Sequence, residues 1–236
     1  MKKHIPNTIT CCNLISGCIA TYFAFAGAFE LALLFIVLGA VFDFFDGMVA
    51  RLLHVSSPIG KELDSLADDI TFGFAPSAIL FTWIGDNMAF GEPVFIIFPF
   101  MAFIMAAFSA LRLAKFNLDE RQALGFIGLP TPANALFWGA LIVGGSDWLS
   151  DIPMAPFVVL LASFVSSYLL VSEIPMFALK FKTWGWKGNE VKYIFLLTCI
   201  PMLLLPLILL QSIIGLAAVI AWYVILSVCT QRKSAQ

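Results

Sequence analysis

Residues 43–68 read DFFDGMVARLLHVSSPIGKELDSLAD and place four aspartates, Asp43, Asp46, Asp64 and Asp68, in a chain that is otherwise strongly apolar. Of the 236 residues, 61% are hydrophobic and 12% are charged, and the mean hydropathy is +0.97. Soluble domains carry about 25% charged residues. The composition therefore predicts an all-α, polytopic integral membrane protein, in which four acids within one short stretch need a specific explanation.

The rest of the chain divides into apolar segments close to the ~20 residues that cross a bilayer as a helix. These segments lie at about 9–27, 31–53, 63–84, 93–115, 131–149, 154–172, 191–210 and 212–230. No soluble domain or long linker interrupts them. We therefore expect about eight transmembrane helices in a single membrane-embedded domain, residues 1–236.

The positions of the cations test this number of spans, because Lys and Arg collect in cytoplasmic loops. With a cytoplasmic N-terminus, all 13 cations fall on the cytoplasmic side: Lys2, Lys3, Arg51, Lys61, Arg112, Lys115, Arg121, Lys180, Lys182, Lys187, Lys192, Arg232 and Lys233. The outer loops carry only acids: Glu30, Asp86, Glu92, Asp147 and Asp151. Both termini are therefore expected in the cytoplasm, and residues 43–68 straddle the first cytoplasmic turn.

The N-terminus imitates a signal peptide, because Lys2, Lys3 and His4 precede an apolar run. The stretch IPNTIT separates the two and many more spans follow, so we expect the first helix to be retained. The five cysteines have no spacing typical of a zinc site or a disulfide framework. We interpret them as small apolar residues, and nothing in the chain points to nucleic acid.

The four aspartates form two pairs on neighbouring helices. Asp43 and Asp46 are spaced i, i+3 near the end of the second segment, and Asp64 and Asp68 are spaced i, i+4 at the start of the third. Side chains at these spacings share one helix face. A turn of about ten residues, Leu53–Glu62, would bring the two pairs face to face.

Four carboxylates at a membrane face require compensation, since one unpaired acid at the centre of a membrane helix costs roughly 2.5–3.5 kcal/mol. Protonation could supply it, as in a proton relay, and so could a shared cation. Carboxylate oxygens suit Mg²⁺ or Mn²⁺, and four acids could hold two such ions about 3.5–4 Å apart, as in phosphoryl transfer. Asp69 lies about 140° around the helix from Asp64, so we leave it out of the cluster.

The residues between the two pairs agree with a phosphate ligand. Gly47 and Ala50 leave a gap at the helix surface, Arg51 follows one turn later to meet an anion, and Gly60 could admit a nucleotide ring or ribose. A single glycine in a membrane helix is more often a packing contact. The joint spacing is what favours a ligand site.

Written as a pattern, the stretch is DxxDGxxAR, eight residues, then GxxxDxxxD, with every fixed position filled. This resembles the signature of the CDP-alcohol phosphotransferases, in which a CDP-linked alcohol donates its phosphoryl-alcohol moiety to a second alcohol and releases CMP. The resemblance implies that Asp43, Asp46, Asp64 and Asp68 bind two divalent cations, Mg²⁺ or Mn²⁺. It also implies that Asp68 is the general base.

The same resemblance implies a CDP-binding site lined by Asp46, Gly47, Ala50, Arg51 and Gly60. The family's N-terminal Pro-Asn followed by Thr is matched in IPNTIT, which adds Asn7 and Thr10. Asn and Thr are also ordinary helix N-caps, so that reading stays open for both residues.

Within the family, the chain is most similar to the bacterial and archaeal phosphatidylserine synthases, through its span number and through the stretches ITCCNLISG (9–17), FSALRLAKFN (108–117) and GFIGLPTPAN (125–134). The resemblance covers about residues 1–140, the expected catalytic core, while the helices of about 150–230 match only in number. It implies CDP-diacylglycerol and L-serine as substrates and membrane lipids as surroundings. It further implies a homodimer in the cell (inner) membrane of a prokaryote, with the active site facing the cytoplasm.

Four residues are candidates for the acceptor site: Asn13, Arg112, Lys115 and Asn117. Arg112 and Lys115 share a helix face at i, i+3 and could bind the serine carboxylate or the lipid phosphate, although positive-inside anchoring explains them equally. Asn117 could bind serine or serve as a helix C-cap. The stretch GLPTP would form a stiff loop beside the site, or only begin the next span.

Other readings remain open at this point. Within the family, the acceptor could instead be glycerol phosphate, inositol phosphate or a choline-type alcohol; phosphorylated acceptors need extra cations, which Arg112, Lys115 and Arg121 could supply. A cation or proton transporter could use the same acids. That alternative explains neither the Gly, Ala and Arg positions nor acids at one membrane face rather than at its midplane.

Overall fold

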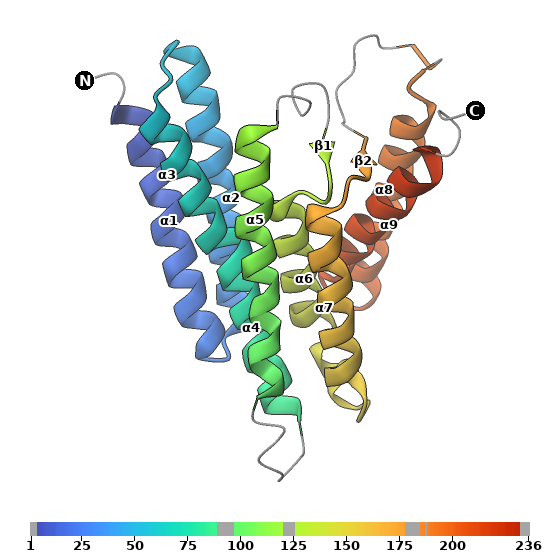
Figure 1. The fold of residues 1–236 in the computed structure, drawn as a ribbon. Coiled ribbons are helices and arrows are strands. Elements are labelled where there is room, and N and C mark those ends of the chain that lie inside the picture. The colour runs from blue at the N-terminus through green and yellow to red at the C-terminus, as the bar shows by residue number, and fades with distance from the viewer. Residues whose placement is uncertain (1–3, 89–96, 120–125, 178–184, 187, 232–236) are drawn as a thin grey trace.

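The computed structural model describes residues 4–88, 97–119, 126–177, 185–186 and 188–231, and in these ranges the chain is almost entirely helical (Figure 1). The helices are α1 (His4–Phe25), α2 (Phe29–Leu52), α3 (Pro58–Asp68), the π-helical turn η1 (Asp69–Phe74), α4 (Ala75–Asn87), the 3₁₀ segment η3 (Phe98–Phe103), α5 (Ile104–Leu118), α6 (Thr131–Ser150), α7 (Ala155–Val171), α8 (Glu190–Leu209) and α9 (Ile214–Gln231). The predicted all-α class is confirmed.

Each predicted apolar segment overlaps a helix or a continuous helical run in the described part of the chain. Four of these are long and apolar enough to cross a membrane by length and composition: α1, α2, Phe98–Leu118 and α8. The apolar helices Ala155–Val171 and Ile214–Thr230 are shorter. The run from α3 through η1 to α4 is unbroken from Pro58 to Asn87 but carries polar residues in its first turns.

The helices run alternately up and down, so that the start of α1, the α2–α3 turn, the end of α5 and the end of α9 lie at one end of the bundle (Figure 1). We call this the cation end, because the described cations lie at or near it: Arg51, Lys61, Arg112, Lys115 and Lys192. The opposite end carries Glu30, Asp86, Asp147 and Asp151. Lys2, Lys3, Glu92, Arg121, Lys180, Lys182, Lys187, Arg232 and Lys233 lie outside the described residues.

The turn between α2 and α3 is shorter than the ten residues that we expected, since α3 already begins at Pro58. The Ser57 hydroxyl caps this helix by accepting a hydrogen bond from the Gly60 backbone N–H at 3.0 Å. Proline is favoured at the first helical position, where its missing N–H is not needed. The prediction of a start near residue 63 was wrong because the first turns of α3 are polar, and an apolar window begins only after them.

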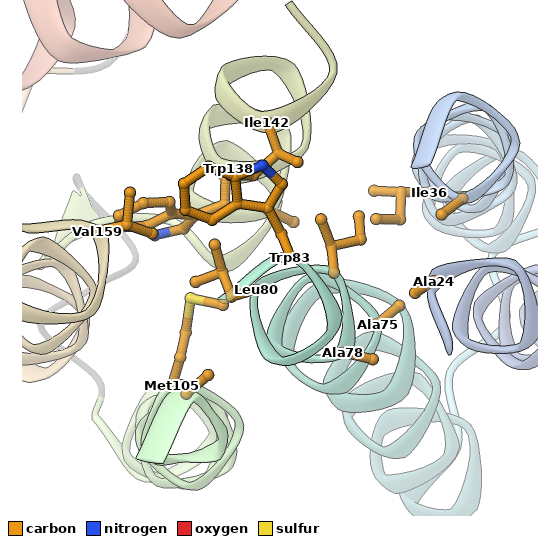
Figure 2. Close-up of a cluster of buried hydrophobic side chains, with 14 of the residues drawn as sticks. Ala24, Ile36, Ala75, Ala78, Leu80, Trp83, Met105, Trp138, Ile142 and Val159 are labelled. Carbon is orange, nitrogen blue, oxygen red and sulfur yellow. The ribbon is translucent and has the colours of Figure 1, made fainter. Parts of the chain in front are cut away.

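The core of the bundle surrounds α4, which contacts α1, α2, α5, α6 and α7. Figure 2 shows Leu80 and Trp83 of α4 beside Trp138 of α6 and Met105 of α5. Where α4 meets α1, the buried residues are small, such as Ala75 and Ala78. Small residues let membrane helices approach closely, so α1 and the helical run that follows α3 are held in a fixed relation.

A two-residue antiparallel strand pair, β1 (Phe126–Ile127) with β2 (Pro175–Met176), ties the segment before α6 to the segment after α7. Gly128, at φ 76°, lies in the left-handed region that glycine adopts readily. The Leu129 N–H then donates to the Leu169 carbonyl at 2.9 Å. These contacts hold the GLPTP stretch in place at the start of α6.

Candidate active site

The carboxylates of Asp43, Asp64 and Asp68 converge at the cation end of α2 and α3. Each offers an oxygen atom, and these atoms all lie within 4.8 Å of one another. Asp68 is only 9% exposed, and one oxygen of Asp64 is buried without a hydrogen-bond partner. Three acids this close repel one another unless a cation or protons lie between them. The two helices therefore do bring the pairs together, as the spacing predicted.

Asp46 and Asp69 lie outside this group of three. The Thr10 hydroxyl donates a hydrogen bond to Asp46 Oδ2 at 2.6 Å, which turns the 6% exposed carboxylate toward α1. Asp69 begins η1 and is not part of the group, in agreement with its predicted position off the shared face. The fourth predicted acid is thus beside the cluster rather than within it.

A cavity of about 320 Å³ lies between α1, the end of α2 and the start of α3; we call it the α1 cavity. It is lined by predicted CDP-site residues: Asn7, Thr10, Asp46, Gly47, Ala50 and Gly60. Asn7 and Thr10 are inside α1, which begins at His4, so the N-cap reading of these two residues was wrong. Gly60 lies so near Asn7 that an added Cβ would be 3.1 Å from Asn7 Oδ1.

A second cavity, of about 560 Å³, opens between α2, α3, α5 and the start of α6; we call it the α5 cavity. All four predicted metal-binding aspartates line it, together with Arg51, which is absent from the α1 cavity lining. The two cavities share Asp46, Gly47, Lys61 and Asp64. The carboxylates therefore lie between two cavities that are each lined in part by polar side chains.

Arg112 lies on the α5 cavity and is 7% exposed. Its Nη1 is 3.5 Å from Thr131 Oγ1, its guanidinium carbon lies 5.8 Å from the centre of the Phe116 ring, and its Nε has no hydrogen-bond partner. Lys115 is exposed and does not line the cavity. Of the two cations expected to share a helix face, the structure thus places only Arg112 on the cavity, because Arg112 is buried in the bundle and Lys115 is exposed.

The two candidate asparagines contact other residues of the site. Asn13 Nδ2 donates to Asp68 Oδ1 at 2.9 Å, so it holds a carboxylate instead of pointing into the α5 cavity. Asn117 lies inside α5 and lines that cavity, and its Nδ2 donates to Ser65 Oγ at 2.8 Å. The C-cap reading of Asn117 was wrong, because α5 ends at Leu118 with Asp119 as its cap.

Sequence reasoning missed several residues of the site. Lys61 lines both cavities, and its Nζ donates to the Asn117 carbonyl at 2.6 Å. Thr131, which lies in the quoted GLPTP stretch, lines the α5 cavity. Asn134, one turn further along α6, is outside both cavity linings; it is 1% exposed, and neither of its amide atoms has a hydrogen-bond partner. A polar residue in an apolar span was the available signal for Asn134.

The donor set fits a divalent cation. Three carboxylate groups supply hard oxygen ligands of the kind that Mg²⁺ and Mn²⁺ prefer. The buried, unpartnered oxygen of Asp64 is a ligand atom that lacks a bond within the protein. The cluster could hold a divalent ion.

An apolar helical bundle with converging carboxylates between two polar cavities is the architecture of a membrane-embedded enzyme. The profile of the family described as CDP-alcohol phosphatidyltransferase matches residues 3–229. The chain therefore belongs to the CDP-alcohol phosphatidyltransferase family, and membership makes it a transferase. The match extends well past residue 140, where the sequence resemblance ended.

Curated relatives give a narrower comparison. The chain is 35% identical over 172 residues to the CDP-diacylglycerol–serine O-phosphatidyltransferase of Bacillus subtilis. The alignment covers 73% of this chain and 89% of the relative. The chain is 37% identical over 133 residues to the enzyme of that name from Helicobacter pylori, covering 56% of this chain and 54% of the relative. The Methanocaldococcus jannaschii enzyme of that name is 37% identical over 140 residues, covering 59% of each chain.

Proposed function

We propose that this protein transfers the phosphatidyl group of CDP-diacylglycerol to the hydroxyl of L-serine, giving phosphatidylserine and CMP. The observation that carries the proposal is the carboxylate cluster between a glycine-lined cavity on one side and a cavity with a buried arginine on the other. Two substrates can thus approach the same acids from different directions. The names of the curated relatives support this choice of donor and acceptor.

The donor is assigned to the α1 cavity. Its walls carry little side chain at Gly47, Ala50 and Gly60, so that the cytidine and its ribose fit against the backbone. Asn7 and Thr10 line it from α1, and the Thr10 hydroxyl donates a hydrogen bond to Asp46. Lys61, which lines both cavities, and the nearby Arg51 supply positive charge for the pyrophosphate. The diacyl chains remain in the bilayer.

The acceptor is assigned to the α5 cavity. Arg112 is the buried cation there, and a guanidinium presents a planar fork that matches a carboxylate. Thr131 and Asn117 offer hydroxyl and amide groups on the same wall. Lys115 is left out of the acceptor site and serves as a positive charge at the membrane surface, since it is exposed.

Asp68 is proposed as the general base. Its Oδ1 accepts from Asn13, which leaves Oδ2 for the serine hydroxyl. The proton passes to Asp68 as the serine oxygen bonds to the phosphorus that carries diacylglycerol, and the bond from that phosphorus to CMP breaks. A base must lie within hydrogen-bond reach of the proton that it takes.

Two divalent cations, held by Asp43, Asp46, Asp64 and Asp68, complete the proposed site. When bound, they would neutralise the pyrophosphate and the charge that develops on the leaving CMP. Asp46 lines both cavities with Asp64, which supports a role for Asp46 in holding a second ion. Mg²⁺ and Mn²⁺ both suit this all-oxygen donor set.

We further propose eight membrane spans in a single domain over residues 1–236, with a catalytic core of about residues 1–140, a cytoplasmic active site and both termini in the cytoplasm. The cation end, which holds the carboxylates, supports this orientation through the positive-inside rule. Location in the inner membrane of a prokaryote and a homodimeric state are proposed from the family resemblance.

The experiment is a CMP-release assay with purified protein in detergent, CDP-diacylglycerol, Mn²⁺ or Mg²⁺, and one acceptor at a time. We expect release with L-serine and little with glycerol 3-phosphate, inositol phosphate or choline. Turnover with glycerol 3-phosphate and none with serine would contradict the acceptor and keep the family. No release with any alcohol would contradict the proposed chemistry.

A further inference from the structure

The helical run that carries Asp68 changes its winding immediately after this residue. Residues Asp69–Phe74 form the π-helical turn η1, and α-helix resumes at Ala75. Single π-helical turns inside α-helices are rare and frequent at functional sites. Thr71 lies in this turn and is fully buried. Its contacts lead back to Asp68 through another helix.

Two hydrogen bonds connect Thr71 to Asp68 through Asn13 of α1. The Thr71 hydroxyl donates to the Asn13 backbone carbonyl at 3.1 Å, and Asn13 Nδ2 donates to Asp68 Oδ1 at 2.9 Å. Asn13 is fully buried, and its Oδ1 has no partner. The amide keeps its nitrogen toward Asp68 because the opposite orientation would set an oxygen against a carboxylate.

Glycines on two helices make room for this arrangement. Gly17 follows Asn13 by four residues, so its backbone N–H pairs with the Asn13 carbonyl in the α-helix. A Cβ on Gly17 would overlap the hydroxyl and backbone of Thr71. A Cβ on Gly39 of α2 would overlap Thr71 Cγ2 and lie 2.9 Å from Asn13 Oδ1. Both helices thus contact Thr71 closely, and neither contact leaves room for an added methyl group.

We propose that Thr71 is a positioning residue for the carboxylate cluster. Its hydrogen bond fixes the position of α1 along its axis relative to η1. Through Asn13 it also fixes the orientation of the Asp68 carboxylate. Thr71 itself is absent from the lining of both cavities. The inference rests on the proposed function of Asp68; apart from Asp68 itself, the contacts that carry it involve none of the residues proposed to bind CDP or serine.

The test compares Thr71→Val with Thr71→Ser. Valine keeps the branched shape and replaces the hydroxyl with a methyl group, and the Asn13 carbonyl retains its helical partner, so the fold should be preserved. We expect kcat to fall roughly 10-fold to 100-fold, as for a small misplacement of a reacting group. The KM values for both substrates should stay within about twofold. Thr71→Ser retains the hydroxyl and should restore kcat to within about threefold of the wild type.

A readout independent of turnover is the rise in melting temperature on adding Mn²⁺ alone. Thr71→Val should need several-fold more Mn²⁺ than the wild type or Thr71→Ser to reach the same rise, since one carboxylate is no longer aimed at the cluster. Equal kcat and equal Mn²⁺ response in the valine and wild-type proteins would overturn the inference. A wild-type protein that releases no CMP would instead contradict the proposed function and leave the Mn²⁺ comparison to decide this inference.

Gly39→Ala supplies a second test that does not depend on the folding of the valine variant. The added methyl group should lower kcat, because it pushes on Thr71 Cγ2 and on Asn13 Oδ1. Serine lacks Cγ2, so the double variant Gly39→Ala/Thr71→Ser should recover a large part of the loss. A double variant that is no more active than Gly39→Ala would overturn the proposed link.

Discussion

Gly47 and Arg51 face each other across one turn of α2, and a Cβ built on Gly47 would lie 3.5 Å from Arg51 Nη1. This is an ordinary van der Waals distance. The protein itself therefore leaves room for an alanine at position 47. A glycine here is not required by packing within the chain, so its purpose is to be sought in the α1 and α5 cavities, both of which it lines.

Gly47→Ala should leave the melting temperature unchanged or slightly higher, since alanine favours a helix interior over glycine. The KM for CDP-diacylglycerol should rise about tenfold, equivalent to about 1.4 kcal/mol, because the methyl group occupies space needed by the donor. Gly85→Ala on α4, where a Cβ would meet Pro99 at 3.8 Å, is the matched control with unchanged kinetics. An unchanged KM for CDP-diacylglycerol in Gly47→Ala would contradict the proposal that the donor binds against Gly47.

Arg112→Lys should weaken the binding of L-serine and leave the binding of CDP-diacylglycerol unchanged. Lysine retains the charge but lacks the planar fork, and a hydrogen bond to a charged group contributes about 1.5–3 kcal/mol. We expect the KM for L-serine to rise at least tenfold, with the KM for CDP-diacylglycerol within about twofold. Lys115→Gln, three residues away but exposed, should change neither constant. A serine effect at Lys115 and none at Arg112 would restore the assignment that the sequence alone suggested for Lys115.

Removal of one carboxylate should reveal the metal requirement. Chelation of divalent ions should abolish CMP release, and added Mn²⁺ or Mg²⁺ should restore it. Asp64→Asn removes a ligand whose buried oxygen has no partner in the protein, so at least tenfold more Mn²⁺ should be needed for half-maximal activity. Glu62→Gln on the same helix is exposed and should behave like the wild type. Activity that survives chelation would refute the metal assignment.

The orientation in the membrane can be tested in intact cells with a membrane-impermeant maleimide, in a variant lacking the five native cysteines. A single cysteine at Asp151, in the turn after α6, should be labelled from outside. A single cysteine at His54, in the turn after α2, should be labelled only after the membrane is opened. The reverse pattern would place the carboxylate cluster outside the cell.

The sequence was sufficient to predict the convergence of the acids, because i, i+3 and i, i+4 spacings on two adjacent helices leave few other arrangements. The start of α3 was predicted five residues late. Ser57 and Pro58 are the ordinary signals of a helix start, but they precede a polar turn that a search for apolar segments passes over.

The support of Asp68 could not be predicted in the same way. Asn13 is 55 residues away in sequence and Thr71 acts through the Asn13 backbone, so their relation depends on how α1 packs against η1. The π-helical turn has no sequence signature among residues 69–74. The structure distinguishes Arg112, which is buried, from Lys115, which is exposed. Their spacing on one helix does not determine which of the two faces the bundle.

In the proposed reaction, Asp68, held in the carboxylate cluster, takes the proton from the serine hydroxyl. The most direct measurement is serine-dependent CMP release by Asp68→Asn, beside Asp86→Asn at the opposite end of the bundle as the matched control. We expect at least a 1,000-fold loss of kcat in Asp68→Asn, a scale typical of removing a central catalytic group. We expect an unchanged rate in Asp86→Asn and an intact fold in both. A folded Asp68→Asn protein that turns over serine at the wild-type rate would contradict this role of Asp68.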